Sequence, residues 1–193
     1  MIEGLAAFVA WLGASTVVLA DGRRGLALGV ALATAALAAI VWPDAGPAAA
    51  VVLGLGGLAA AARRLVVGTA GWGIMPPGST PRFILCIGGG LLALWIALGV
   101  TSGHSSALRF AVLTVAGLSG ARALSSEEPA VLLTAVVLLA LAVSVAAGLA
   151  DGSPSIWTYL LAAALGHRLS PGLARPGRRR IGRDRGDRRG AGL

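Results

Sequence analysis

Seven continuously apolar stretches constrain the fold of this chain more than any other feature. They run over residues 4–20, 25–42, 46–62, 83–101, 107–123, 129–150 and 154–167. A helix needs about 20 residues to cross about 30 Å of hydrocarbon, and the first six stretches meet or approach that length. Strands can cross lipid only as closed barrels, whose residues alternate between apolar and polar. Because these stretches are unbroken, we expect an all-α, polytopic integral membrane bundle of about seven transmembrane helices.

The composition supports this class and excludes others. Hydrophobic residues make up 56% of the 193 residues and charged residues 12%, against roughly 45–50% and about 25% in soluble domains. A soluble globular enzyme, a disordered chain and a coiled coil are all excluded. We expect one transmembrane helical domain over residues 1–167, followed by a tail over residues 168–193.

The tail holds most of the net charge of +8. It has little to bury, so we expect a disordered cytoplasmic segment. We predict that its arginines bind anionic lipid headgroups; they are Arg175, Arg178, Arg179, Arg180, Arg183, Arg185, Arg188 and Arg189. Nucleic acid is the less favoured alternative, because the tail lacks the interleaved aromatic residues that would stack on bases.

Arginine placement predicts the orientation of the bundle. The gaps after the first, third and fifth stretches, together with the tail, hold 15 of the 16 arginines, and Arg109 is the remaining one. Positive residues favour the cytoplasmic side of a membrane. We therefore expect the N-terminus outside and the C-terminus inside, which requires seven spans. A six-span alternative stays open, because the stretch 154–167 is short enough to lie in the interface instead.

Local signals predict where the helices break. Pro43 and Pro47 bracket a predicted outer turn. Ser125, with Glu128 three residues later, resembles a capping box and predicts a helix start. The long inner loop over residues 63–82 contains Trp72, which we expect to anchor a short segment in the membrane interface.

Few side chains offer chemistry, and each has a simpler structural explanation. Glu127 and Glu128 are adjacent carboxylates that could hold a divalent cation or pair with Arg122, although helix capping also explains them. His104 and Arg109 could line an outward polar pocket, or simply a hydrated turn. No ionisable residue lies in the middle of a span, which argues against an ion-coupled pump. We expect no catalytic residue, no metal site and no cofactor.

The general style, a small Ala- and Leu-rich chain with bare helices, is similar to that of many bacterial membrane proteins and small subunits of membrane complexes. We therefore expect a multi-pass protein of the bacterial cell (inner) membrane. The first hypothesis is a non-enzymatic structural or accessory component with membrane-protein partners. The alternative is a small transporter or lipid-handling protein for a neutral or amphiphilic solute. A membrane enzyme that uses Glu127 and Glu128 ranks last.

Overall fold

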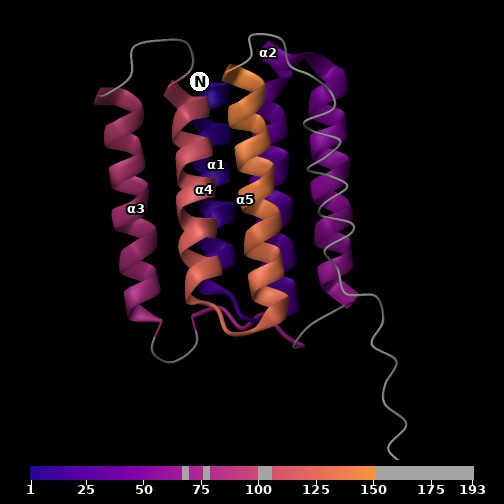
Figure 1. Ribbon diagram of the computed structural model, residues 1–193, viewed down its shortest axis with the longest axis vertical. Coiled ribbons are helices and arrows are strands. Elements are labelled where there is room, and N and C mark those ends of the chain that lie inside the picture. The colour runs from indigo at the N-terminus through magenta and orange to yellow at the C-terminus, as the bar shows by residue number, and fades with distance from the viewer. Residues whose placement is uncertain (67–69, 76–78, 100–105, 151–193) are drawn as a thin grey trace, which may run out of the picture.

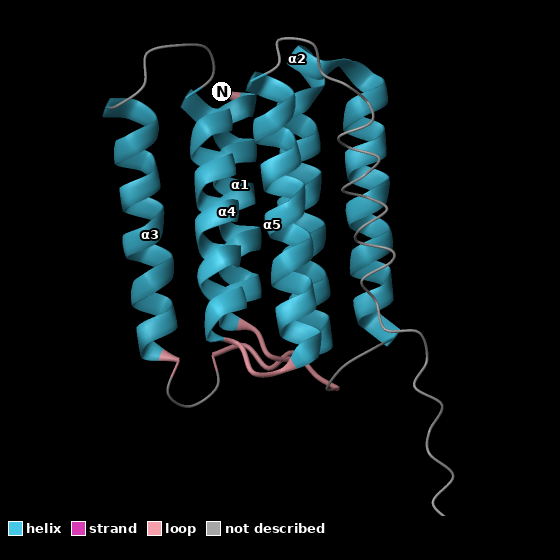
Figure 2. Cartoon of the chain, viewed as in Figure 1, coloured by secondary structure: helices cyan, strands magenta, loops and turns pink. Residues whose placement is uncertain are grey.

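All regular structure in the described part of the chain is helical. The computed structural model describes residues 1–66, 70–75, 79–99 and 106–150. Within them the helices are α1 (Ile2–Leu19), α2 (Arg23–Val66), α3 (Thr80–Gly99), α4 (Ser106–Ser125) and α5 (Pro129–Ala150) (Figures 1 and 2). All five are long and apolar enough to span a membrane. The all-α, multi-pass prediction is confirmed. The stretch 154–167 and the tail lie outside the described residues, so the seven-span count stays a prediction.

Helix α2 is a hairpin of two helical arms. Its 44 residues would form a straight rod of about 66 Å, roughly twice the hydrocarbon thickness. The chain folds back at Gly46, whose φ of 80° and ψ of 170° fall in a region that is essentially restricted to glycine. A Cβ atom on Gly57 would overlap the side chain of Thr34, so the two arms are in direct contact. The turn predicted between Pro43 and Pro47 is therefore confirmed, while its place outside the membrane stays a prediction.

The helices pack side by side, with α3 at one edge of the bundle and the second arm of α2 at the other (Figure 1). Helix α1 packs against α2, α3 and α4, while α5 packs against α4 and α2. The N-terminus and the Gly46 turn lie at the same end (Figure 1). The opposite end is called here the arginine-rich end, because the helix termini there contribute Arg23, Arg24, Arg63, Arg64, Arg82 and Arg122.

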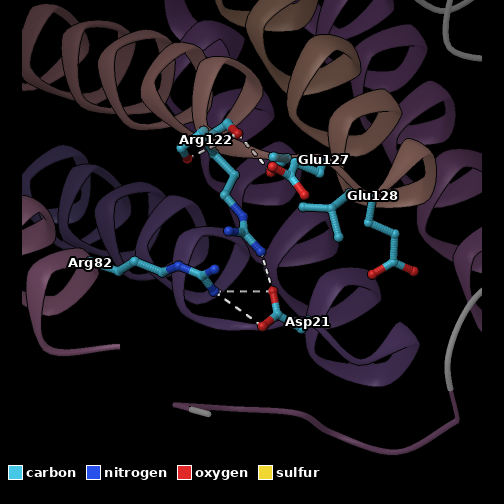
Figure 3. A pocket seen from close by; sticks show the side chains of 8 residues that line it. Asp21, Arg82, Arg122, Glu127 and Glu128 are labelled. Atoms are coloured by element: carbon cyan, nitrogen blue, oxygen red, sulfur yellow. Dashed lines mark hydrogen bonds and ion pairs between the residues drawn. The ribbon is translucent and has the colours of Figure 1, made fainter. Parts of the chain in front are cut away.

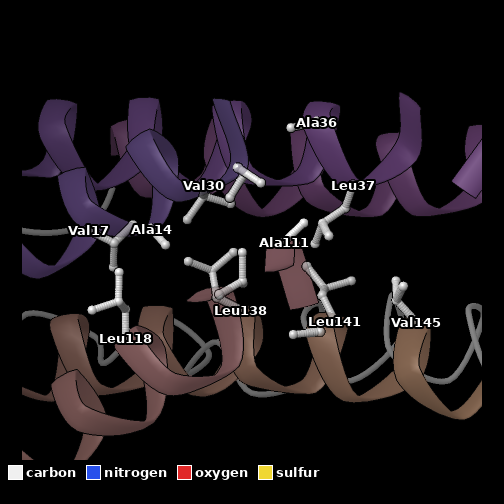
Figure 4. Close-up of a cluster of buried hydrophobic side chains, with 14 of the residues drawn as sticks. Ala14, Val17, Val30, Ala36, Leu37, Ala111, Leu118, Leu138, Leu141 and Val145 are labelled. Atoms are coloured by element: carbon white, nitrogen blue, oxygen red, sulfur yellow. The ribbon is translucent and has the colours of Figure 1, made fainter. Parts of the chain in front are cut away.

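Small and aliphatic side chains fill the interior between α1, α2, α4 and α5 (Figure 4). Lipid tails are as apolar as leucine, so helices in a membrane associate through close packing rather than through burial from water. Gly13 and Gly29 let the backbones of α1 and α2 approach each other closely. A Cβ atom on Gly13 would lie 2.8 Å from the carbonyl oxygen of Gly29, and one on Gly29 would lie 2.6 Å from Val17 Cγ2. Gly29 thus permits close packing of α2 on α1, whereas a Cβ atom on Gly25 would meet Ala20 and the carbonyl oxygen of Trp72 in the connecting segments.

Helix α3 packs mainly against α4, and Trp11 links it to α1 as well. Its indole Nε1 donates a hydrogen bond of 3.1 Å to the carbonyl oxygen of Cys86. Gly90 leaves the room for the indole ring, since a Cβ atom there would lie 2.5 Å from Trp11 Nε1. Gly90 therefore lets α1 and α3 pack closely around an aromatic ring.

Candidate functional site

The turn between α1 and α2 is the centre of the arginine-rich end. Helix α1 ends at Leu19, and Ala20 is extended, with φ −97° and ψ 136°. Asp21 and Gly22 follow, and the amide of Leu26 already bonds to the carbonyl of Gly22 at 3.0 Å. This short connection leaves the Asp21 side chain outside both helices, at the end of the bundle.

Residues 70–75 lie on this turn as an extended segment. Backbone amides donate from Asp21 to Gly73 (3.0 Å), from Arg24 to Gly71 (3.2 Å) and from Met75 to Leu19 (3.1 Å). Gly22 is required here, because a Cβ atom at that position would lie 2.5 Å from the carbonyl oxygen of Gly71. The loop that contains Trp72 is thus held by backbone hydrogen bonds to the α1–α2 turn. The loop is also shorter than the predicted 63–82, since α2 continues to Val66 and α3 begins at Thr80.

Asp21 joins three parts of the chain through ion pairs (Figure 3). Its carboxylate accepts two hydrogen bonds of 3.1 Å from Nη1 of Arg82, in the first turn of α3. It accepts another from Nη2 of Arg122, in the last turn of α4. Nη2 of Arg122 also lies 3.4 Å from the carbonyl oxygen of Ala20. One carboxylate therefore connects the α1–α2 turn with α3 and α4.

Burial makes the Arg122 pair the critical one. Arg122 is only 2% exposed, whereas the side chains of Asp21 and Arg82 are 35% and 34% exposed. A buried charge needs a partner, because breaking a buried pair leaves a desolvated charge uncompensated. Asp21 supplies that partner to Arg122, while its contact with Arg82 is more accessible to water and correspondingly weaker.

A cavity of about 300 Å³ opens beside these ion pairs. Glu127 and Glu128 line it together with Asp21, Arg82 and Arg122 (Figure 3). The structure thus brings the two predicted glutamates to the arginine cluster. Arg122 forms its ion pair with Asp21 rather than with either glutamate. Among the described residues, no group of three or more His, Cys, Asp or Glu side chains is arranged to hold a metal ion.

The predicted capping role of Ser125 is wrong. Ser125 is the last residue of α4, and α5 begins only at Pro129. The hydroxyl groups of Ser125 and Ser126 donate to the carbonyl oxygen of Arg122, at 3.3 Å and 2.7 Å. Serine hydroxyls can close a helix C-terminus in this way as readily as they start a new helix. Ser125 and Ser126 both line the cavity, and both hydroxyls bond to a carbonyl group in the last turn of α4.

The other candidate residues lie apart from this cluster. Trp72 lines a separate groove between the arms of α2. Arg109 lies in the first turn of α4, at the opposite end of that helix from Arg122. His104 and the tail arginines Arg175–Arg189 lie outside the described residues.

Sequence reasoning missed Asp21, the centre of the cluster. The available signal was its position, because Asp21 is the single acid in the short connection between the first two apolar stretches. The same connection contains Arg23 and Arg24, which were used only to predict the orientation. Its partners are 61 and 101 residues away in the chain. No sequence spacing connects them, so the pairing could be seen only in the tertiary structure.

Comparisons of the chain with protein-family models, with curated proteins and with solved structures found no match to any of them.

Proposed function

We propose that this protein is a non-catalytic integral membrane protein that serves as a structural or accessory component of a membrane assembly. The observation that carries this proposal is the exposure of α3. In its most apolar stretch only 22% of the residues are buried, against 39–61% in the other four helices. Helix α3 therefore presents a large free helical surface at one edge of the bundle, as the second arm of α2, with only Ala49, Ala50, Leu53, Gly57 and Ala61 buried, does at the other.

The exposed face of α3 combines large apolar side chains with a glycine. Gly88 is exposed, and a Cβ atom on it would meet nothing within 4 Å. Small residues let a second helix approach closely in a membrane, and large neighbours then pack around the contact. The large exposed side chains of α3 include Ile84, Leu91, Leu92, Trp95 and Leu98. This surface is suited to a partner helix.

Hydroxyl groups inside the helices support a non-transporting role. Five of them are buried and donate to carbonyl oxygens three or four residues earlier in their own helix. A hydroxyl that is bonded within its own helix has less hydrogen-bonding capacity to offer a permeating solute. They belong to Thr34, Thr114, Ser119, Thr134 and Ser144.

One observation favours the second candidate, a transporter or lipid-handling protein for a neutral or amphiphilic solute. An apolar groove of about 470 Å³ lies between the two arms of α2, a volume in the range of ligand-binding pockets. The groove lies at the arginine-rich end, where Arg24 and Trp72 line it.

Gentle detergent extraction of the tagged protein, followed by mass spectrometry, tests the proposal. We expect partners in fixed stoichiometry. Gly88→Leu should remove them, because the added side chain blocks close approach to α3. Gly117→Leu on α4 is the matched control, since Gly117 is also exposed with nothing within 4 Å. Recovery of the protein as a single species with bound lipid or solute would overturn the proposal and favour the second candidate.

A further inference from the structure

The groove between the arms of α2 has an apolar floor and apolar walls. Ala31 of the first arm and Ala61 and Ala62 of the second are small, so the antiparallel arms leave space between them. Leu28, Leu58 and Leu65 also line the groove and are 41%, 53% and 51% exposed. The groove therefore opens sideways on a face that carries apolar side chains.

Trp72 lines the groove at its arginine-rich end and is 51% exposed. The backbone of its loop is fixed against the start of α2, where a Cβ atom on Gly25 would lie 2.7 Å from the carbonyl oxygen of Trp72. The hydrogen bond of 3.2 Å from the amide of Arg24 to the carbonyl of Gly71 holds the same segment. The tryptophan is thus placed at the level where aromatic residues contact both headgroups and acyl chains.

Positive charge gathers at the same end of the groove. Arg24 is exposed and lines the groove directly. The fold of the hairpin also brings Arg63 and Arg64, in the last turn of α2, to the end where Arg23 and Arg24 begin it. The nearest acid along the chain, Asp21, is already shared by Arg82 and Arg122. This end of the groove therefore favours an anionic group.

We infer that this groove binds one acyl chain of an anionic phospholipid, with the lipid headgroup at Arg24 and the chain between the arms of α2 beside Trp72. An apolar channel with cationic and aromatic residues at one end matches a lipid with a charged headgroup. A soluble anion would leave the alanine-lined part of the groove empty, and a lipid without net charge would gain less from the charge of Arg24 than an anionic lipid does. The binding does not depend on whether the protein has partner subunits.

Quenching of Trp72 by brominated lipids tests this inference. The full-length protein is placed in phosphatidylcholine vesicles that contain increasing brominated phosphatidylglycerol or brominated phosphatidylcholine. The fluorescence of Trp72 is obtained by subtracting that of Trp72→Phe. We expect half-maximal quenching at an about fivefold lower mole fraction of the anionic lipid, the preference given by one basic residue near the surface.

Two pairs of variants separate a site from general attraction. Arg24→Gln should abolish the preference, while Arg23→Gln, which removes the same charge one residue away and outside the groove lining, should preserve it. Ala62→Phe should block quenching by filling the groove, while Ala59→Phe, exposed on the same arm but outside the lining, should not.

Equal quenching by both lipids would overturn the inference and indicate a neutral lipid. Quenching that neither Arg24→Gln nor Ala62→Phe changes would also overturn it. That result would mean that the groove is filled by another segment of this chain or by a second copy.

Discussion

Single residues at the arginine-rich end hold distant segments together. Asp21 satisfies Arg122, which is buried, and Arg82, which is partly exposed. Gly22 brings the loop of residues 70–75 against the same turn. The result is a closed end to the bundle, in which one acidic side chain compensates two basic ones from different helices. Removing that acid therefore affects more than one contact.

Asp21→Asn should destabilise the protein through Arg122. The variant leaves a buried guanidinium without its carboxylate, a change that costs about 3–5 kcal/mol for a fully buried pair. We expect the lower part of this range, because the Asp21 side chain is 35% exposed. Thermal unfolding in detergent measures the effect as a decrease in Tm.

Glu127→Gln is the matched control for this prediction, because Glu127 lines the same cavity. We expect an effect of about 0–1 kcal/mol, as for an exposed charge. Arg122→Met added to Asp21→Asn should recover part of the stability, since it removes the uncompensated charge. Equal destabilisation by Asp21→Asn and Glu127→Gln would contradict the role given to the ion pair.

At the scale of elements, glycine positions decide how closely the helices approach one another. Gly13 and Gly29 let α1 and α2 pack backbone to backbone, and Gly90 makes room for Trp11 between α1 and α3. Gly46 supplies the positive φ that folds α2 into two arms. Other glycines, such as Gly54, have room for a Cβ atom at an ordinary van der Waals distance from their neighbours. Among the described residues, a glycine therefore shapes the packing within the bundle where a neighbour occupies the space of its missing Cβ, or where φ is positive.

Gly29→Ala should weaken the packing of α1 against α2. The new methyl group would meet Val17 Cγ2 at 2.6 Å and the carbonyl oxygen of Gly13 at 2.7 Å, so the helices must separate. Overpacking of this kind costs about 1–3 kcal/mol. A decrease in Tm on thermal unfolding in detergent is the expected result.

Gly54→Ala provides the comparison within the same helix. A Cβ atom there meets only Ala38 Cβ, at 3.8 Å, an ordinary contact. We expect no loss and a gain of up to about 1 kcal/mol from the lower entropy of the unfolded chain. If both substitutions lowered Tm equally, close packing at Gly29 would not be the cause.

On the scale of the whole molecule, charge separates the two ends of the bundle. Six arginines from the described helices gather at one end, and Asp44 lies beside the Gly46 turn at the other. This distribution supports the proposed orientation, with the arginine-rich end in the cytoplasm. The multi-pass architecture is established by the helices themselves, whereas the direction of insertion and the bacterial inner membrane are proposals.

Labelling of single cysteines tests the direction of insertion. In a Cys86→Ser background, Asp44→Cys should react with a membrane-impermeant maleimide added to intact cells. Glu127→Cys should react only after the membrane is permeabilised. Arg188→Cys in the tail should behave like Glu127→Cys if seven spans are present, and like Asp44→Cys if there are six. Reaction of Glu127→Cys in intact cells would show that the protein has the opposite orientation and would contradict the proposal.

The sequence by itself determined the class, the approximate bounds of the described helices and the turn at Gly46. Unbroken apolar runs of this length have one stable form in lipid, and local signals such as Pro43 and Pro47 mark where a run must end. Glu127 and Glu128, which stand out in the sequence as adjacent carboxylates, lie at the arginine-rich end. The capping role of Ser125 was predicted wrongly, because a serine hydroxyl can form hydrogen bonds at the start or at the end of a helix.

Only the tertiary structure decided which residues meet. Asp21 finds its partners 61 and 101 residues away, and the groove beside Trp72 forms from two arms of α2 and a loop that docks on its start. The physical reason is that helix formation in a membrane depends on local composition. Pairing between helices depends instead on which small residues allow close approach, and no periodic pattern in the sequence specifies that choice.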